Sequence, residues 1–260
     1  MTQVAFIGGG RVARILVGGW QRASALPPVV LVHEPDDAAF GALESVAPAV
    51  RRASVEEAAG AAVVFLALHP PAIPGALAAI RAALGRDAVL VSLAPKITIA
   101  ALSAGAGTTR VARMIPNAPS ILGLGYNPLA FGAGLDAAAE ARLTGLLAPL
   151  GQAPEVDEAH LEGYAILSGM GPTYFWFQWQ ALRDIAAGMG LSGEATGAAL
   201  RSTVAGAMAT LLDSGLAPAA VIDLVPVKPL AAAEAAIEAA YRDALPALYA
   251  KIRPAPPQAG

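Results

Sequence analysis

The chain has 260 residues, a formal net charge of −3, no cysteine and three histidines, and 56% of its residues are hydrophobic, which is ample for one large core or two smaller ones. The absence of cysteine excludes disulfides and thiolate nucleophiles. The spacing of His33, His69 and His160 argues against a metal site. Because the chain has no basic run, nucleic-acid binding has little electrostatic support. No apolar run reaches the ~18 to 20 residues of a membrane span and no secretory signal pattern follows Met1, so we expect no membrane or nucleic-acid partner and a soluble, cytoplasmic protein.

The first half of the chain alternates short apolar runs with amphipathic, alanine-rich stretches. The runs are typical of buried strands and cover residues 4–8, 29–34, 61–68, 87–94 and 109–114. Because helical stretches lie between them, the order predicts an α/β fold with a parallel sheet and helices on both of its faces.

The pattern changes from about Glu158. Three long helical segments follow, at 174–190, 193–215 and 230–252, and no strand pattern is found among them. We therefore expect an α/β domain over residues 1–157 and an all-helical domain over residues 158–260, with a disordered tail beginning near Arg253.

A glycine motif joins the first strand to the first helix. Gly8, Gly10 and Ala13 form G-x-G-x-x-A in the strand-to-helix context that a dinucleotide-binding, Rossmann-type domain requires. Gly8 permits a tight turn, Gly10 lets a pyrophosphate approach the backbone, and the first helical turn, with Arg11 and Val12, offers N–H groups to the anion. A glycine-rich turn without a ligand is the alternative.

Glu34 follows the second strand, about where an acid accepts hydrogen bonds from the adenosine ribose in NAD-binding folds. A carboxylate at this position repels a 2′-phosphate, so NAD(H) is favoured as cofactor. NADP(H) stays open, because Arg11, Arg51 and Arg52 could supply cations to a phosphate. Ser54 begins a capping box and is expected to start a helix, although it could also face the adenosine.

Further candidates follow the next strands, whose carboxyl ends meet at one edge of the sheet. Leu68, His69 and Pro70 end one strand, and Lys96 follows the next. We expect them to contact the cofactor, and His69 could also donate a proton. A structural histidine and a solvated loop lysine are the alternatives. Asn117 lies in a stiff loop between Pro116 and Pro119, where it could bind a nicotinamide amide or a substrate.

The segment S-G-M-G-P-T-Y opens the helical part. Ser168 and Thr173 offer hydroxyls near a helix N-terminus, which suits an anion or a carboxylate, and Tyr174 is a candidate pocket residue. A plain helix start is the alternative. The aromatic residues that follow favour packing in a core or a dimer interface, namely Phe175, Trp176, Phe177 and Trp179.

These motifs together resemble those of pyrroline-5-carboxylate reductases: the early Gly-x-Gly, His69-Pro70 where Lys-Pro is usual, M-I-P-N-A-P beside the usual M-P-N-T-P, and S-G-M-G-P-T-Y beside the usual S-G-S-G-P-A-Y. The resemblance implies a Rossmann domain, a helical domain that dimerises by helix exchange, and NAD(P)H-dependent reduction of a cyclic imine to proline. It also implies a site between the cofactor and the partner's helices, and a homodimer or a larger dimer-based oligomer.

The chain departs from that family at the loop that holds the substrate carboxylate. The usual Ser-Pro-Gly-Gly-Thr-Thr is replaced by D-L-V-P-V-K-P-L, in which Lys228 could supply a point charge in place of the lost donors. Lys96 also replaces a usual glycine. These changes leave the natural substrate open.

Two other functions are compatible with the same domains. A β-hydroxyacid dehydrogenase is expected to carry a catalytic lysine on the helix after a Gly-x-x-Gly turn, but the lysines of this chain are Lys96, Lys228 and Lys251. A non-catalytic dinucleotide-binding redox sensor is favoured by the altered loop and disfavoured by the intact-looking segments around Asn117 and Ser168.

Overall fold

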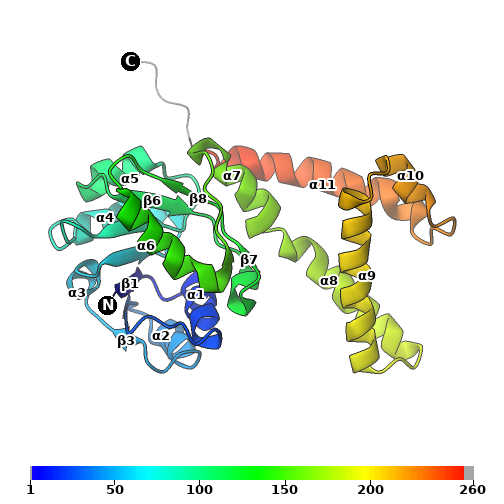
Figure 1. The fold of residues 1–260 in the computed structure, drawn as a ribbon, viewed down its shortest axis with the longest axis horizontal. Helices are drawn as coiled ribbons and strands as arrows, with labels where there is room; N and C mark the ends of the chain where they lie inside the picture. The colour runs from blue at the N-terminus through cyan, green and yellow to red at the C-terminus, as the bar shows by residue number, and fades with distance from the viewer. Residues whose placement is uncertain (1, 255–260) are drawn as a thin grey trace, which may run out of the picture. The chain divides into compact units, whose positions relative to one another are not determined.

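The computed structural model describes residues 2–254 and forms two compact units. Among the described residues, 2–170 together with 248–254 make up the sheet unit, and residues 171–247 make up the helical unit (Figure 1). The domain boundary expected near residue 157 stays a prediction, because a compact unit need not coincide with a domain. The tail expected to be disordered falls mainly on residues 255–260, which lie outside the described residues.

The sheet unit is built on seven strands in the order β3-β2-β1-β4-β5-β6-β8. They are β1 (Gln3–Ile7), β2 (Val29–His33), β3 (Arg51–Arg52), β4 (Val63–Leu66), β5 (Val89–Ser92), β6 (Val111–Met114) and β8 (Leu129–Phe131). Parallel pairing joins all of them except β8, which is antiparallel to β6. The parallel, helix-covered sheet confirms the predicted α/β class. The antiparallel edge strand was not predicted, because three residues are too few to show the hydrophobic pattern of a strand.

Alternate residues of the strands point into two separate cores. Val4 and Phe6 belong to one core, whereas Ala5 and Ile7 belong to the other. The helices that cover the sheet are α1 (Arg11–Arg22), α2 (Asp37–Glu44), α3 (Val55–Ala59), α4 (Ile73–Ile80), α5 (Ile99–Ala106) and α6 (Ala137–Leu147). Burial on both faces explains why the strand sequences are continuously apolar rather than alternating.

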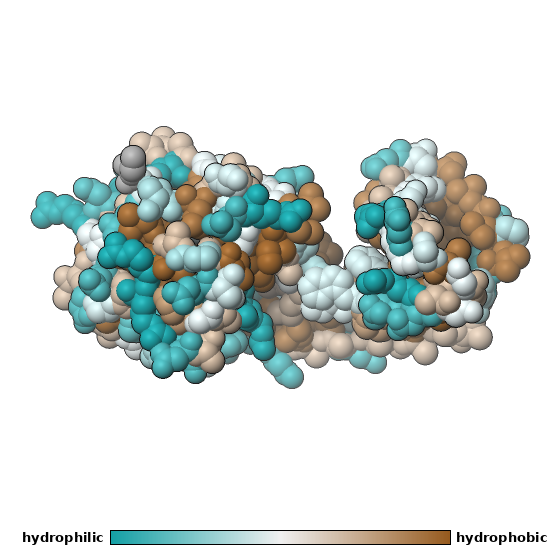
Figure 2. Space-filling model, turned by 90° about the horizontal axis from the view of Figure 1, so that it is seen from below, coloured by the Kyte–Doolittle hydropathy of each residue, from teal (hydrophilic) through white to brown (hydrophobic). Residues whose placement is uncertain are grey.

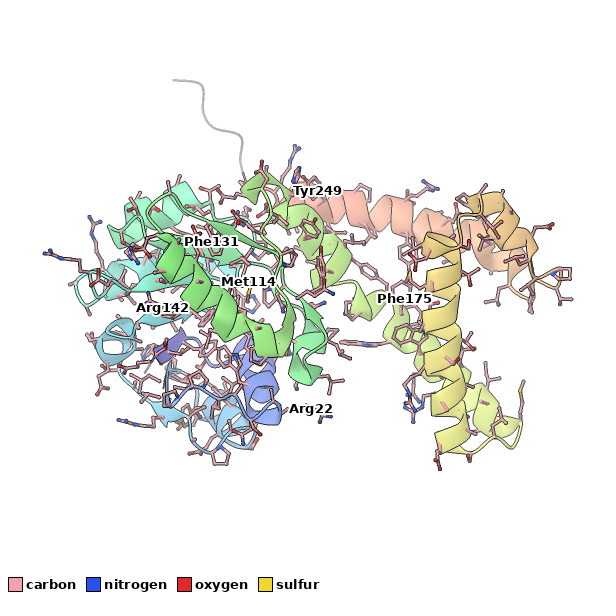
Figure 3. All side chains as sticks on the ribbon, viewed as in Figure 1. Arg22, Met114, Phe131, Arg142, Phe175 and Tyr249 are labelled. Carbon is pink, nitrogen blue, oxygen red and sulfur yellow. The ribbon has the colours of Figure 1, made fainter. Side chains whose placement is uncertain are left out.

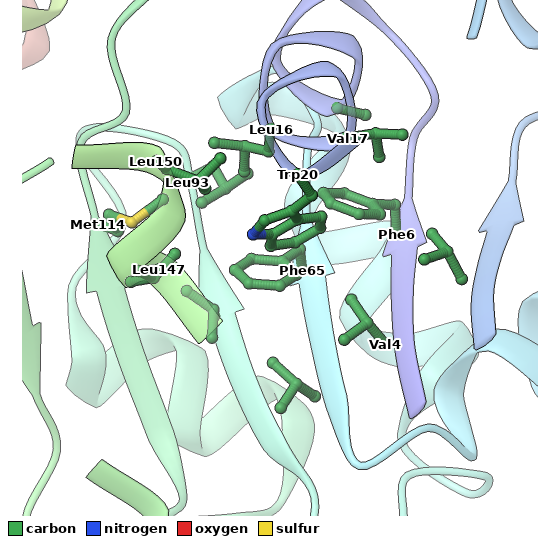
Figure 4. Close-up of a cluster of buried hydrophobic side chains, with 14 of the residues drawn as sticks. Val4, Phe6, Leu16, Val17, Trp20, Phe65, Leu93, Met114, Leu147 and Leu150 are labelled. Carbon is green, nitrogen blue, oxygen red and sulfur yellow. The ribbon is translucent and has the colours of Figure 1, made fainter. Parts of the chain in front are cut away.

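The first core centres on three aromatic side chains (Figure 4). Phe6 and Phe65 stack with ring centroids 5.1 Å apart, and Trp20 of α1 packs against both. The indole N–H of Trp20 donates to the carbonyl oxygen of Leu146 at 2.8 Å, so this buried donor is satisfied and α1 is tied to α6. This core fixes the start of α1, where the glycine motif lies.

Short elements complete the sheet unit. They are the 3₁₀ helices η1 (Pro70–Ala72), η2 (Ala118–Leu122), η3 (Ala148–Leu150) and η4 (Glu158–His160), the paired strands β7 (Gly125–Tyr126) and β9 (Gly151–Gln152), α7 (Leu161–Tyr164) and the π-helical turn η5 (Ala165–Gly169). The segment after Asn117 is thus a 3₁₀ helix rather than the expected loop. A proline is compatible with the first turn of a helix, because the N–H groups of that turn have no partner within the helix.

The helical unit holds α8 (Pro172–Gly188), α9 (Gly193–Asp213), α10 (Pro218–Asp223) and most of α11 (Ala231–Ile252). The three long helices confirm the predicted helical segments. Within these described ranges, α8 and α11 have no buried residue and α9 has only Thr196. Phe175 (labelled in Figure 3), Trp176 and Phe177 are 39%, 49% and 68% exposed, so the aromatic cluster is not part of a core within this chain. Hydrophobic residues accordingly reach the surface of this unit (Figure 2).

No helix among residues 2–254 is both long and apolar enough to span a membrane. In the same part of the chain, no cluster of three or more His, Cys, Asp or Glu side chains is arranged so that it could hold a metal ion.

Candidate functional site

A cleft of about 630 Å³ opens in the sheet unit, at the carboxyl ends of β1, β2, β4 and β5. It lies where the strand order reverses, because β2 and β4 flank β1, and this is where open α/β sheets bind their ligands. Its lining comprises Gly8, Gly10, Arg11, Val12, Arg14, Glu34, Ala67, Leu68, His69, Pro70, Ala72, Leu93, Ala94 and Pro95. The fold thus brings together most of the candidate cofactor residues; Ser54, Lys96 and Asn117 do not line this cleft.

The glycine loop has the geometry that its sequence predicts. Gly8 has φ +100°, and a Cβ there would lie 2.6 Å from the carbonyl oxygen of Ala67, so a side chain cannot be accommodated. Gly10 is the N-cap of α1, with φ −70°, no side chain caps that helix, and a Cβ on Gly10 would meet no atom within 4 Å. Open space beside an uncapped helix N-terminus suits an anionic group.

Glu34 is fixed at the edge of this cleft. Its Oε2 accepts from the backbone N–H of Gly9 at 2.8 Å and its Oε1 accepts from that of Asp36 at 2.9 Å. Nearby, Arg52 pairs with Asp37 at 2.6 Å. The carboxylate is therefore held in place by two donors, and one of the candidate cations for a phosphate is already paired with an acid.

Ser54 forms a capping box with Glu57. The Ser54 hydroxyl accepts from the N–H of Glu57 at 3.1 Å, and the Glu57 carboxylate accepts from the N–H of Ser54 at 3.0 Å. This confirms that Ser54 starts a helix. Its expected contact with adenosine stays a prediction.

The opposite wall of the cleft follows β4 and β5. His69 is exposed and is the N-cap of η1, which places its imidazole at the cleft with no structural hydrogen bond from its ring among the described contacts. Arg14 also lines the cleft, although the sequence analysis missed it. Its signal was the i, i+3 spacing from Arg11, which puts both guanidinium groups on one face of α1.

A buried charge cluster supports the loop after β5. Arg113, whose side chain is 1% exposed, donates to Glu158 at 2.9 Å and to Glu162 at 2.5 Å. Glu162 also accepts from the backbone N–H of Lys96 at 2.9 Å, and Glu158 from that of Ile99 at 2.6 Å. Sequence reasoning missed this cluster, because its members are far apart in the chain and no spacing rule joins them.

Asn117 is held by the protein on both sides of its amide. Its Oδ1 accepts from the N–H of Tyr126 at 3.0 Å, and its Nδ2 donates to the carbonyl oxygen of Ser168 at 3.4 Å. The Ser168 hydroxyl in turn donates to the carbonyl oxygen of Tyr164 at 2.9 Å. Asn117 and Ser168, both proposed site residues, are therefore brought together within the sheet unit. Their roles toward ligands stay predictions.

The other candidate residues belong to the helical unit. Thr173 and Tyr174 line a mostly apolar pocket of about 690 Å³ between α8 and α11. Burial, and then the neighbouring Tyr241, raise the pKa of the Tyr174 phenol above its usual range. Lys228 is exposed just before α11 and does not line that pocket.

Comparison with known proteins gives consistent relatives. Residues 3–96 match the family model described as "NADP oxidoreductase coenzyme F420-dependent". The chain is 34% identical to a pyrroline-5-carboxylate reductase of Pseudomonas aeruginosa over 84% of its own length and 81% of the relative's. It is 32% identical to that of Corynebacterium melassecola, over 74% and 73% of the two chains.

Solved structures agree in fold. A Plasmodium falciparum pyrroline carboxylate reductase with NADP bound is similar with a TM-score of 0.73 and 18% identity, covering 96% of this chain and 94% of the other. A Coxiella burnetii pyrroline-5-carboxylate reductase is similar with a TM-score of 0.67 and 24% identity over the same shares. At these identities the likeness concerns the fold.

Proposed function

Because the chain belongs to the pyrroline-5-carboxylate reductase family, we propose that it is an NAD(P)H-dependent oxidoreductase that reduces the C=N bond of a cyclic imine, either 1-pyrroline-5-carboxylate or a related compound. The observation that carries this proposal is the cleft at the switch point of the sheet, where the glycine loop, Glu34 and the His69 segment meet.

The residues of the cleft fit a dinucleotide. The uncapped start of α1 would hold the pyrophosphate, because Gly10 leaves room for it and Arg11 and Arg14 add positive charge. When bound, the reduced nicotinamide supplies the hydride. The protein would then orient the nicotinamide and exclude water from it. Leu68 and residues 93–95, which line the cleft, would form the wall that does so.

NADH is the favoured cofactor. The Glu34 carboxylate can accept from the ribose hydroxyls and would repel a 2′-phosphate. The pairing of Arg52 with Asp37 further reduces the positive charge available to a phosphate. Ser54 would lie on the adenosine side and Lys96 on the nicotinamide side of the cofactor.

The substrate side is assigned to Ser168, Thr173, Tyr174 and Lys228. The first three would orient the imine through their hydroxyls, and the raised pKa makes the Tyr174 phenol a weaker acid than an ordinary tyrosine. Lys228 would attract the substrate carboxylate in place of the lost hydroxyl donors. Asn117 would help to close the nicotinamide side of the cofactor site, because its amide holds the surrounding segments in place.

The working form is proposed to be a homodimer or an assembly of dimers. The support is the helical unit itself: Phe177 of α8 is 68% exposed, Met189 is 75% and Leu212 of α9 is 68%. Large apolar side chains this exposed to water, on or directly after helices with almost no buried residue, are typical of a surface that binds another protein. A second copy of the same unit would supply it.

The test is absorbance decay of NADH, and separately of NADPH, with 1-pyrroline-5-carboxylate and with a panel of carboxylated and uncarboxylated cyclic imines. Turnover of the carboxylated pyrroline, with a higher KM in Lys228→Ala and an unchanged KM in the matched control Lys251→Ala, would support both substrate and residue. Cofactor binding without turnover of any imine would overturn the enzymatic proposal in favour of a redox sensor.

An alcohol dehydrogenase of the β-hydroxyacid type is not favoured by the structure. Its catalytic lysine is expected on the helix after a Gly-x-x-Gly turn, and α8 (Pro172–Gly188) contains no lysine.

A further inference from the structure

Lys96 adopts a backbone conformation that side chains disfavour. Its φ is +78°, in the left-handed region, and apart from Ser24 it is the only non-glycine residue with positive φ among residues 2–254. It directly follows Leu93, Ala94 and Pro95, which line the cofactor cleft. A conformation of this kind persists only where the surroundings impose it.

The surroundings that impose it are the buried charge cluster. The N–H of Lys96 donates to Glu162 at 2.9 Å and the N–H of Ile99 donates to Glu158 at 2.6 Å, so both ends of the turn are anchored on carboxylates. One guanidinium, that of Arg113 on β6, holds both carboxylates. Arg113 and Glu162 have side chains only 1% and 2% exposed, which leaves the cluster little freedom to rearrange.

We propose that Arg113, Glu158 and Glu162 are positioning residues that set the nicotinamide side of the cleft through the turn at Lys96. Glu34 marks the adenosine side, at the end of β2, whereas β5 lies beyond β4 on the other side of β1. The turn after β5 therefore borders the reacting half of the cofactor. This inference rests on the proposed cofactor binding, but not on the identity of the imine.

Stability alone is a poor explanation for the cluster. A buried ion pair is commonly no more stabilising than apolar side chains of the same size, because removing the charges from water is costly. What apolar side chains could not supply here is an acceptor for the N–H of Lys96. The cluster thus anchors the turn by a hydrogen bond that a hydrophobic replacement could not accept.

The decisive variant is Arg113→Met/Glu162→Leu, which removes the acceptor of Lys96 together with its buried cation. Glu158 loses its ion pair in this variant, but its side chain is 31% exposed and it keeps the hydrogen bond from the N–H of Ile99. We expect the double variant to fold, to bind NADH with an affinity within about threefold of wild type, since the α1 contacts remain, and to lose at least about tenfold in kcat from misplacement of the reacting groups. The fluorescence of bound NADH, which needs no imine, should shift toward that of free NADH. The matched control, Glu238→Gln/Arg242→Gln, removes an exposed ion pair of α11 and should change neither readout.

Lys96→Gly separates positioning from general damage. Glycine adopts the left-handed conformation without an anchor, so in the Lys96→Gly background the same double change should cost less than about threefold in kcat and leave NADH fluorescence unchanged. Glu162→Gln, which keeps an acceptor, should also retain the wild-type fluorescence, and it provides the test if the double variant does not fold.

Two results would overturn the proposal. One is wild-type fluorescence and kcat in a folded Arg113→Met/Glu162→Leu variant. The other is an equal loss of kcat from the double change with and without Lys96→Gly, which would mean that the cluster has only a structural role. If no imine is turned over but the fluorescence pattern is as expected, the proposed activity fails and the positioning role stands.

Discussion

Gly10→Ala is the change that best separates folding from cofactor binding. Gly10 has φ −70° and ψ −160°, an extended conformation open to alanine, and the added Cβ would meet no protein atom within 4 Å. The empty protein therefore accommodates the methyl group. The proposed cofactor does not, because its pyrophosphate would occupy that space.

The expected magnitudes follow from this geometry. Alanine is a poorer N-cap than glycine by roughly 0.5 to 1 kcal/mol, but it lowers the entropy of the unfolded chain by a stabilising ~0.4 to 1 kcal/mol. These effects offset each other, so the free energy of unfolding should change by less than about 1 kcal/mol. Displacing the pyrophosphate from the helix N-terminus should weaken NADH binding by at least about tenfold, or ~1.4 kcal/mol.

The assay pairs urea denaturation with NADH titration by fluorescence. Gly41→Ala is the matched control: Gly41 is exposed in the middle of α2, and its Cβ would also meet no atom within 4 Å. It should raise stability by about 1 kcal/mol, as glycine is a poor helix former, and leave NADH binding unchanged. Gly8→Ala should instead lower both stability and binding, because its Cβ would clash with Ala67.

Wild-type NADH affinity in Gly10→Ala would refute the reasoning, because it would mean that no ligand approaches this part of the backbone. A large loss of stability in the same variant would show that the space beside Gly10 is not open.

The remaining predictions concern charge and assembly. Glu34→Gln should raise the affinity for NADPH relative to NADH by roughly tenfold, as it removes the carboxylate that repels a 2′-phosphate, and an unchanged ratio in parallel titrations would contradict this. Arg113→Met alone should lower the free energy of unfolding by ~3 to 5 kcal/mol in urea denaturation, since it leaves the buried Glu162 unpaired; a loss below about 1 kcal/mol would argue against a buried pair. The pKa of Asp136 lies below its usual 3.8, first because its carboxylate accepts from the N–H of Ala139 and then because Arg110 donates to it. The resulting stabilisation is present above the usual pKa and is lost as the pH falls through the lower folded-state pKa. Asp136→Asn should therefore be less stable than wild type at pH 7, and the difference should shrink as the pH is lowered below 3.8; a difference that does not depend on pH would exclude the carboxylate charge as its source. Phe177→Glu should shift the proposed dimer toward monomer in light scattering, and a dimeric mass that does not change would show that this face is not the interface.

The sequence by itself determined the central strands, the long helices and the place of the proposed cofactor cleft. The apolar runs predict the central strands because strands buried on both faces must be apolar throughout. Gly8 and Gly10 predict the turn and the helix start because their requirements are local: a positive φ at one position and open space at the other. The long helices of the second half were likewise evident from periodicity alone.

Only the tertiary structure decided which polar groups meet. Arg113 bonds to Glu162 across a long stretch of chain that carries no spacing pattern, and the hydrogen bond from Gly9 to Glu34 likewise forms only once β1 and β2 lie side by side. Asn117 was predicted to bind a nicotinamide amide or a substrate, and this stays a prediction. The bonds of its amide to Tyr126 and Ser168 were not predicted, because the folding of distant segments brought these partners beside it. Backbone preferences and hydrophobic periods act over a few residues, whereas hydrogen bonds and ion pairs of this kind depend on the three-dimensional path of the whole chain.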